Sequence, residues 1–444
     1  GESYCFFLLF RKKKGVFDLE VHDQVMTYID TAKEKMRWKR AKKLMELELS
    51  EQLYDEIDQH VQEGLSEAEA VKAVFDKAQA PEVVGNTWDK QYRPKIAWKF
   101  GIFVLTLIFI GFAFYLVTVS VNDLFMGYVT KSLFVMLGCG ILLWAVICLI
   151  DYTLYFRYAK LLYTVLCLLS LGVFYYESTY RNGFDWLNYI FLFFPILWGG
   201  LLFYWKNHNY ALLKVSLFAL FPMLLAGYMM SAVLLIYLFL SYLFIIGYGI
   251  WQKWLPLSLL DWIFFGVNAV YIGYNVFYLT YHSPYVYDTP KLLESASFIG
   301  HITAPIASDQ LFNHLESIIQ NHPLIVYIQQ FGWLPVIVIL WLGLVFLFFF
   351  LKMMYKENSA LGKLLIFLVM VIFFIQGVVG ILDTAGIFLT TAESPFLIYP
   401  PFLVAKPIFL VINLMFAGLV SAVVYQQTIG EKLLQMRLKQ MQEE

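Results

Sequence analysis

From residue 96 onward the sequence consists of apolar runs long enough to cross a lipid bilayer. A helix needs about 20 predominantly apolar residues to span the hydrocarbon core. Backbone N–H and C=O groups find no water there, so a run that crosses must be helical. The sequence predicts an all-α, polytopic membrane protein with about ten spans. We place these spans at residues 97–119, 132–150, 158–176, 187–204, 211–228, 230–250, 257–280, 332–354, 362–383 and 403–425.

Composition agrees with this class and excludes several others. Of the 444 residues, 60% are hydrophobic and only 15% are charged, which is too apolar for a soluble domain. The formal net charge of -1 gives no general attraction for nucleic acid, so the expected partner is the lipid bilayer. The four cysteines show no spacing typical of a metal site or a disulfide framework. We expect no metal site and no cofactor, with a divalent cation as the alternative.

Lys and Arg residues gather at alternate connections between the runs. Arg93 and Lys95 precede the first run, Arg157 and Lys160 follow the second, and Lys432 lies beyond the last. Because basic connections remain in the cytoplasm, this distribution predicts that both termini are cytoplasmic. An even number of spans is then required, and ten satisfies it.

The first 95 residues differ from the rest. We expect residues 1–15 to be a disordered or expression-derived end, because their apolar patch is too short to span a membrane. Residues 16–95 are predicted to form a small cytoplasmic helical domain. Its basic run, residues 33–43, is interpreted as a solvated face near anionic lipid headgroups. The last segment, residues 427–444, is expected to be a cytoplasmic tail.

Local signals place helices within this domain. We expect one helix between residues 21 and 47, or two, and another to begin at Ser50 and end at Gly64. Ser66 and Glu69 have the spacing of a capping box for the following helix. Pro81 should stop that helix, because proline removes a backbone donor.

The connection between the seventh and eighth runs, residues 281–331, is by far the longest. Long loops in compact proteins tend to be functional. It carries several carboxylates and histidines, of which Asp309, Glu316 and His322 are candidates for acid–base chemistry. Ordinary solvated polar residues are the alternative interpretation, because the sequence contains no soluble-enzyme motif.

The stretch from Gln376 to Gly418 is the most informative part of the membrane region. It leaves one apolar run at Asp383, crosses a proline-rich segment at residues 390–401 and enters the last run. Irregular backbone cannot face lipid, so this segment is either a plain external connection or the rim of a site. Asp383 is the strongest candidate for an outward-facing polar cavity, with a role in capping or helix pairing as the alternative.

The order of motifs resembles the SEDS family (shape, elongation, division and sporulation; FtsW/RodA/SpoVE). The resemblance covers residues 97–425, and its motifs are weak singly but jointly specific. They are Ile150-Asp-Tyr152, Asn182-Gly-Phe-Asp-Trp-Leu187, Phe193-Phe-Pro195, Gln376, Gly386-Ile-Phe-Leu-Thr-Thr-Ala392, Ser394-Pro-Phe-Leu-Ile-Tyr399, Asn413 and Gly418. Residues 50–95 resemble a permease-prefix (HAAS-type) helical domain, which precedes membrane proteins in Bacillus-like bacteria.

The resemblance implies a lipid II glycosyltransferase of the bacterial plasma membrane that acts in cell-wall (peptidoglycan) synthesis, cell division or cell shape, usually with a partner transpeptidase. The family's catalytic aspartate falls at Asn321 here, and an amide cannot act as a general base. Asp309, Glu316, His322 or Asp383 would have to replace it. By the same resemblance, the groove for the lipid-linked precursor would include Trp186, Gln376, Thr390, Thr391, Pro395 and Tyr399.

Three alternative functions follow. We expect a membrane domain over residues 96–426 that binds a lipid-linked precursor, with altered or lost glycosyltransferase activity. The alternative is an active polymerase that uses a relocated carboxylate, and a second alternative is a transporter of the precursor.

Overall fold

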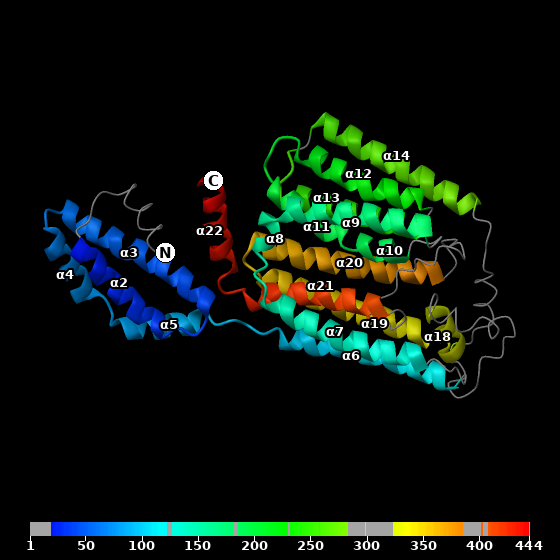
Figure 1. Cartoon of the computed structure of the whole chain (residues 1–444), viewed down its shortest axis with the longest axis horizontal. Helices are drawn as coiled ribbons and strands as arrows, with labels where there is room; N and C mark the ends of the chain where they lie inside the picture. Colours follow the sequence, from blue (N-terminus) through cyan, green and yellow to red (C-terminus); the bar gives the residue numbers. More distant parts are fainter. Residues whose placement is uncertain are drawn as a thin grey trace. The chain divides into compact units, whose positions relative to one another are not determined.

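The structure is a computed structural model of the chain (Figure 1). It describes residues 19–121, 127–180, 185–229, 231–256, 258–282, 298, 323–384, 401–402 and 407–443. Within these ranges every regular element is a helix. The chain forms two compact units: residues 96–425 make up the membrane unit, and residues 1–95 with 426–444 make up the terminal unit.

The membrane unit confirms the predicted fold class. Ten described helical segments are long and apolar enough to cross a bilayer, and each lies within a few residues of its predicted range. Their helices are α6 (Trp98–Val121), α7 (Gly127–Leu149), α9 (Ala159–Tyr180), the pair α10 (Asp185–Phe191) and α11 (Phe194–Tyr204), α12 (Ala211–Tyr228), α13 (Ala232–Trp251), α14 (Leu259–His282), α19 (Leu334–Lys356), α20 (Ala360–Thr384) and α21 (Pro407–Tyr425). Two shorter helices, α8 (Leu154–Arg157) and α18 (Pro323–Phe331), complete the unit.

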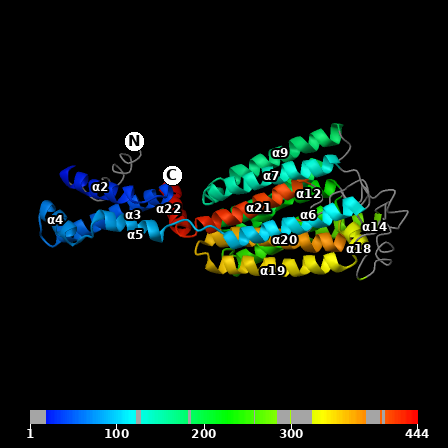
Figure 2. The same ribbon diagram turned by 90° about the horizontal axis from the view of Figure 1, so that it is seen from below.

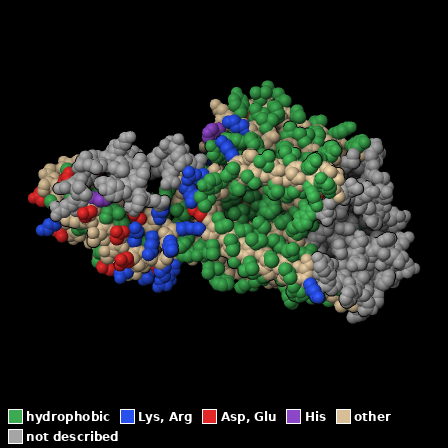
Figure 3. Space-filling model, in the orientation of Figure 1, with side chains coloured by type: hydrophobic (Ala, Val, Ile, Leu, Met, Phe, Trp, Pro, Cys, Tyr) green, Lys and Arg blue, Asp and Glu red, His purple; other side chains and the backbone are tan. Residues whose placement is uncertain are grey.

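The surface of this unit is that of a membrane protein. Phe109, Val270 and Leu344 are each more than 60% exposed. Exposing such apolar side chains to water is unfavourable, whereas contact with lipid removes this free-energy cost. Figure 3 shows hydrophobic side chains over most of the described face of the membrane unit, whereas the charged side chains of that view lie mainly on the terminal unit. The protein is therefore a multi-pass membrane protein.

The fourth span is broken, which the prediction of one run at residues 187–204 did not show. Pro195 lies in the first turn of α11, where its missing N–H is tolerated, and separates α11 from α10. The break leaves backbone carbonyls without helical donors. The Tyr237 hydroxyl donates to the Leu192 carbonyl at the break at 3.1 Å, and the Tyr155 hydroxyl donates to the Ile196 carbonyl in the first turn of α11. This span is the most buried of the ten, 78% inside the unit, so its irregular backbone avoids lipid.

Glycines let α7 and α21 pack closely side by side (Figure 2). A Cβ on Gly418 would lie 3.1 Å from the Ile147 Cβ and 3.2 Å from the Trp144 carbonyl oxygen. The Trp144 Nε1 donates to the Ser421 Oγ at 3.0 Å across the same contact. Membrane helices associate through small residues of this kind because lipid is as apolar as the helices themselves.

The terminal unit consists of α2 (Leu19–Glu34), α3 (Lys39–Gln62), α4 (Glu67–Lys77), α5 (Pro81–Gln91) and α22 (Gly430–Glu443) around one apolar core. The capping box of Ser66 and Glu69 is confirmed. The predicted helix start at Ser50 is wrong: α3 begins at Lys39, and Ser50 is buried inside it with its hydroxyl donating to the Leu47 carbonyl. Pro81 does not end α4 directly but begins α5, where its fixed φ suits a first turn.

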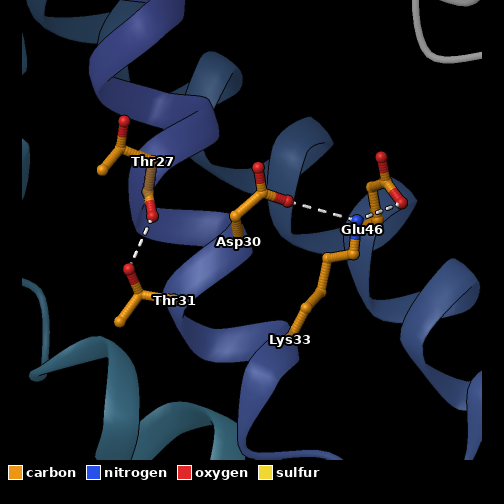
Figure 4. Close-up of polar contacts among 5 residues, drawn as sticks. All are labelled: Thr27, Asp30, Thr31, Lys33 and Glu46. Atoms are coloured by element: carbon orange, nitrogen blue, oxygen red, sulfur yellow. Dashed lines mark hydrogen bonds and ion pairs between the residues drawn. The ribbon is translucent and has the colours of Figure 1, made fainter.

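Lys33 joins α2 to α3. Its Nζ lies 2.8 Å from the Glu46 carboxylate and 3.2 Å from that of Asp30 (Figure 4). On the neighbouring turns of α2, the Thr31 hydroxyl donates to the Thr27 carbonyl. Part of the predicted basic face is therefore engaged in a network within the domain.

The C-terminal helix α22 belongs to the terminal unit, which the expectation of a separate tail did not include. Ile429 and Leu433 are buried in the same core as α2–α5. The Lys432 Nζ donates to the Glu48 carboxylate and to the Tyr92 hydroxyl, both at 2.7 Å. Burial lowers the pKa of Lys432, but these hydrogen bonds more than offset it and raise the pKa above its ordinary value. The segments before α6 and after α21 thus belong to one folded unit. The chain must therefore cross the membrane an even number of times.

Replacing Gly418 by leucine should separate α7 from α21. We expect the unfolding temperature of the detergent-purified protein to fall by an amount that corresponds to about 1–3 kcal/mol, as for other overpacked contacts. Gly138→Leu on α7 is the matched control, because a Cβ there meets nothing within 4 Å. An equal loss in both variants would contradict the close contact.

The stability of the terminal unit should depend on pH through His22, whose Nδ1 lies 2.6 Å from the Tyr54 hydroxyl. Burial lowers the pKa of His22 below 6.5, with the Asp23 carboxylate opposing it. The unfolded chain therefore binds a proton first, and the free energy of unfolding decreases as pH falls from 6.5 to the lowered pKa. Hydrogen exchange of α2 and α3, corrected for intrinsic rates, should show this loss. It should vanish in His22→Gln and persist in His60→Gln.

Candidate functional site

An apolar cavity of about 380 Å³ lies between α6, α19 and α20. Gly111 and Phe114 line it from α6, and Gly343 lines it from α19. On the α20 side the wall includes Phe373 and Gly377. Glycine on all three helices leaves room that larger side chains would fill. The cavity is thus built into the packing of the first, eighth and ninth spans.

The cavity opens toward lipid on one side. Leu340 and Leu344 of its lining are 52% and 67% exposed, whereas Phe346 and Phe373 are buried. An exposed rim with a buried floor makes a groove that opens at the side of the membrane unit.

Phe402 closes the inner side of this groove. It is 1% exposed, and its ring centroid lies 5.4 Å from that of Phe373 and 6.1 Å from that of Phe346. Its φ of 65° is in the left-handed region, a conformation that a phenylalanine adopts only where packing compensates for it. Pro401, the described end of the proline-rich segment, lines the cavity together with Phe402.

The described part of the lining includes no ionisable and no hydrogen-bonding side chain. It is suited to the apolar part of a ligand.

Two buried polar side chains lie near this cavity, on α20 and α21. Gln376 and Asn413 are both 0% exposed, and the amide atoms of neither has a hydrogen-bond partner among the described residues. At about 1.5 Å per residue, Gln376 lies about 12 Å from the end of α20, and Asn413 about 9 Å from the start of α21. These two ends are joined by one connection, so both amides lie at a similar depth.

The break in the fourth span reaches the same region. Phe193, at the break, has its ring centroid 5.3 Å from that of Phe416, one turn from Asn413. Phe416 in turn lies 6.3 Å from Phe373, one turn from Gln376. Buried amides without partners cost about 1–3 kcal/mol each, which a bound polar group or water would recover. We call Gln376, Asn413 and the break at residues 192–193 the polar layer.

The predicted site residues divide into three groups. Gln376 is buried beside the cavity wall at Gly377. Trp186 is 50% exposed at the start of α10, and Asp383 is near the end of α20, where its side chain is not described. The other candidates lie outside the described residues: Asp309, Glu316, Asn321, His322, Thr390, Thr391, Pro395 and Tyr399.

Glu177 is a buried carboxylate that the sequence analysis missed. It is 0% exposed, and its two oxygens accept hydrogen bonds from the backbone N–H groups of Trp186 at 2.7 Å and Leu187 at 3.2 Å. It therefore caps α10 and fixes the start of the broken span. Its signal was a lone glutamate near the end of an apolar run.

Asp151 and Asp261 also have structural roles. Asp151 accepts hydrogen bonds from the Thr153 backbone and hydroxyl before α8. Asp261 accepts from the Leu213 and Ser258 backbone N–H groups and so joins α12 to α14. Among the residues that the structure describes, no group of three His, Cys, Asp or Glu side chains is placed to hold a metal ion.

Comparison with models of known protein families gives no match, and no curated protein is significantly similar to the chain. The function is therefore inferred from the geometry of the cavity and the polar layer.

Replacing Gln376 by leucine should not destabilise the protein. The apolar side chain fills a similar volume and removes an amide that has no partner, a change that is nearly neutral or stabilising. Ser421→Ala is the contrasting variant, because Ser421 accepts the Trp144 N–H, and it should cost about 1 kcal/mol. The unfolding temperatures of the two purified variants test this, and a marked loss in Gln376→Leu would show that the amide is satisfied.

Proposed function

We propose that the protein is a SEDS-like membrane protein of bacterial cell-wall synthesis, division or shape, which binds a lipid-linked precursor and has altered or lost glycosyltransferase activity. The observation that carries this proposal is the apolar groove between α6, α19 and α20, which opens to lipid and ends at Pro401 and Phe402. A groove of this kind accepts the hydrocarbon chain of a lipid-linked sugar while the headgroup remains at the membrane surface.

The position of the groove fits this ligand. Pro401 and Phe402 end the connection between α20 and α21, so a chain bound beside them has its polar end near that connection. Gln376 and Asn413 lie on the same two helices, and their amides have no partner among the described residues. In our proposal they bind the linkage group of the precursor or the water around it.

Altered or lost chemistry is favoured over the usual polymerase activity. The family's catalytic aspartate is replaced by Asn321, and the described groove lining supplies no carboxylate. We also propose that the protein resides in the bacterial plasma membrane with the terminal unit in the cytoplasm, because Lys and Arg gather on the connections of that side. A membrane transpeptidase is the partner that the resemblance suggests.

The experiment that tests this function measures both binding and polymerisation of lipid II by the purified protein, with divalent cation present. We expect saturable binding without glycan product. Product from the wild-type chain, lost in Asp309→Ala, Glu316→Ala or Asp383→Ala, would instead establish an active polymerase and identify its carboxylate. If the protein shows neither binding of lipid II nor glycan product, the proposal is contradicted.

Filling the groove should weaken binding without disturbing the fold. Gly343 and Gly377 line the cavity, and a Cβ at either meets nothing within 4 Å. We expect Gly343→Leu and Gly377→Leu to reduce affinity for lipid II at least tenfold, with unchanged unfolding temperature. Gly273→Leu is the matched control, since Gly273 has equal space on α14 and lies away from the groove. Equal affinity in all three variants would exclude the groove as the binding site.

A further inference from the structure

Three lysines surround aromatic rings at the end of the membrane unit that lies opposite the connection between α20 and α21. They are Lys160 at the start of α9, Lys206 after α11 and Lys214 in the first turn of α12, and we call them the lysine cluster. The Lys160 Nζ lies 4.0 Å from the Tyr204 ring centroid and 5.8 Å from that of Trp205. The Lys214 Nζ lies 6.0 Å from the same Trp205 ring. One indole thus lies between two ammonium groups.

The third lysine is set into the same connection. The Lys206 Nζ lies 4.2 Å from the Phe203 ring centroid and 6.0 Å from that of Trp254. The connection is held in place because the Asn207 N–H donates to the Trp254 carbonyl at 2.8 Å, and Asn207 and Tyr210 take positive φ values of 62° and 58°. The lysines therefore stand on a fixed, tightly turned backbone.

No described carboxylate neutralises the cluster. None of the three lysines forms an ion pair in the part of the chain that the structure describes. The Asp261 carboxylate, which accepts from the backbone N–H of Leu213, is buried and also accepts from Ser258. Burial lowers the pKa of Lys206, as expected for an ammonium group without a counter-ion. The cluster has an excess of positive charge that an anion would balance.

Exposed leucines lie directly beside these charges. Leu161, next to Lys160, is 59% exposed, and Leu217, one turn from Lys214, is 48% exposed. A free phosphate gains nothing from contact with an apolar surface, whereas the acyl chains of a phospholipid would cover these leucines. Lysine and aromatic side chains at a membrane boundary are the groups that contact anionic headgroups.

We infer that the lysine cluster binds the phosphate of an anionic phospholipid headgroup, with the acyl chains along Leu161 and Leu217. This site is separate from the groove between α6, α19 and α20 and does not depend on the precursor proposed above. It would anchor the third, fourth and fifth spans to the anionic lipids of one leaflet.

The test uses the full chain in mild detergent with phosphatidylglycerol and phosphatidylcholine, and the bound lipid is measured by native mass spectrometry. We expect the wild-type protein to prefer phosphatidylglycerol. Each lysine near the surface contributes roughly fivefold in affinity, so Lys160→Gln and Lys214→Gln together should reduce this preference by an order of magnitude or more. The double arginine variant should retain it.

Lys352→Gln provides the matched control. Lys352 lies 5.9 Å from the Phe348 ring centroid at the end of α19, so it has one aromatic neighbour and is outside the cluster. An equal loss in this variant would overturn the inference and leave only a general attraction of basic residues. Competition by millimolar inorganic phosphate as effective as that by the lipid would also overturn it, because the site would then accept a free anion.

A second measurement does not depend on variants that fold. Phosphatidylglycerol with a photoreactive group near the phosphate is crosslinked to the wild-type protein, and the labelled peptides are identified. Labels at residues 160–161, 204–206 and 213–217 would support the site. Labels spread evenly over all basic connections would contradict it.

Discussion

The lack of water in the bilayer core is the constraint on which the structure of the membrane unit depends. Every backbone polar group there needs a partner within the protein, so the apolar runs form helices. The one broken span obeys the same rule. Its freed carbonyl at Leu192 accepts a hydrogen bond from Tyr237, and Glu177 accepts from the N–H groups at its start. The break is tolerated because it is enclosed by other helices.

Gln376 and Asn413 show a different feature, because their side-chain amides are buried without a partner among the described residues. Two fully buried amides without partners would be replaced easily by leucine if they served packing alone. They lie on the helices that end at the proline-rich connection, and α20 also contributes the wall of the apolar groove. In the proposed function, α20 would contribute both an apolar wall for a hydrocarbon chain and a polar residue for the group joined to that chain. This combination is what a lipid-linked ligand needs.

The sequence predicted what depends on local pattern and missed what depends on distant contacts. Hydropathy over each run gave all ten spans, and the spacing of Ser66 and Glu69 gave the start of α4. Ser50 looked like a helix start, but the core contacts of Leu44, Met45 and Leu49 continue α3 through it. The docking of α22 could not be inferred, because its partners Glu48 and Tyr92 are remote in the chain. Glu177 was missed although its partners lie only nine and ten residues further on. The cavity arises from space that side chains leave, which no local signal records.

The alternation of successive spans links the sidedness of the features of the membrane unit. Because α22 packs on the same core as α2–α5, the first and tenth spans connect to one side of the membrane. Successive spans alternate in direction, so the connections that carry the lysine cluster lie on one side of the membrane. The connection at Pro401, and with it the end of the apolar groove, lies on the other side. Locating any one of these features relative to the membrane therefore fixes all of them, and the proposed function requires the groove to end outside.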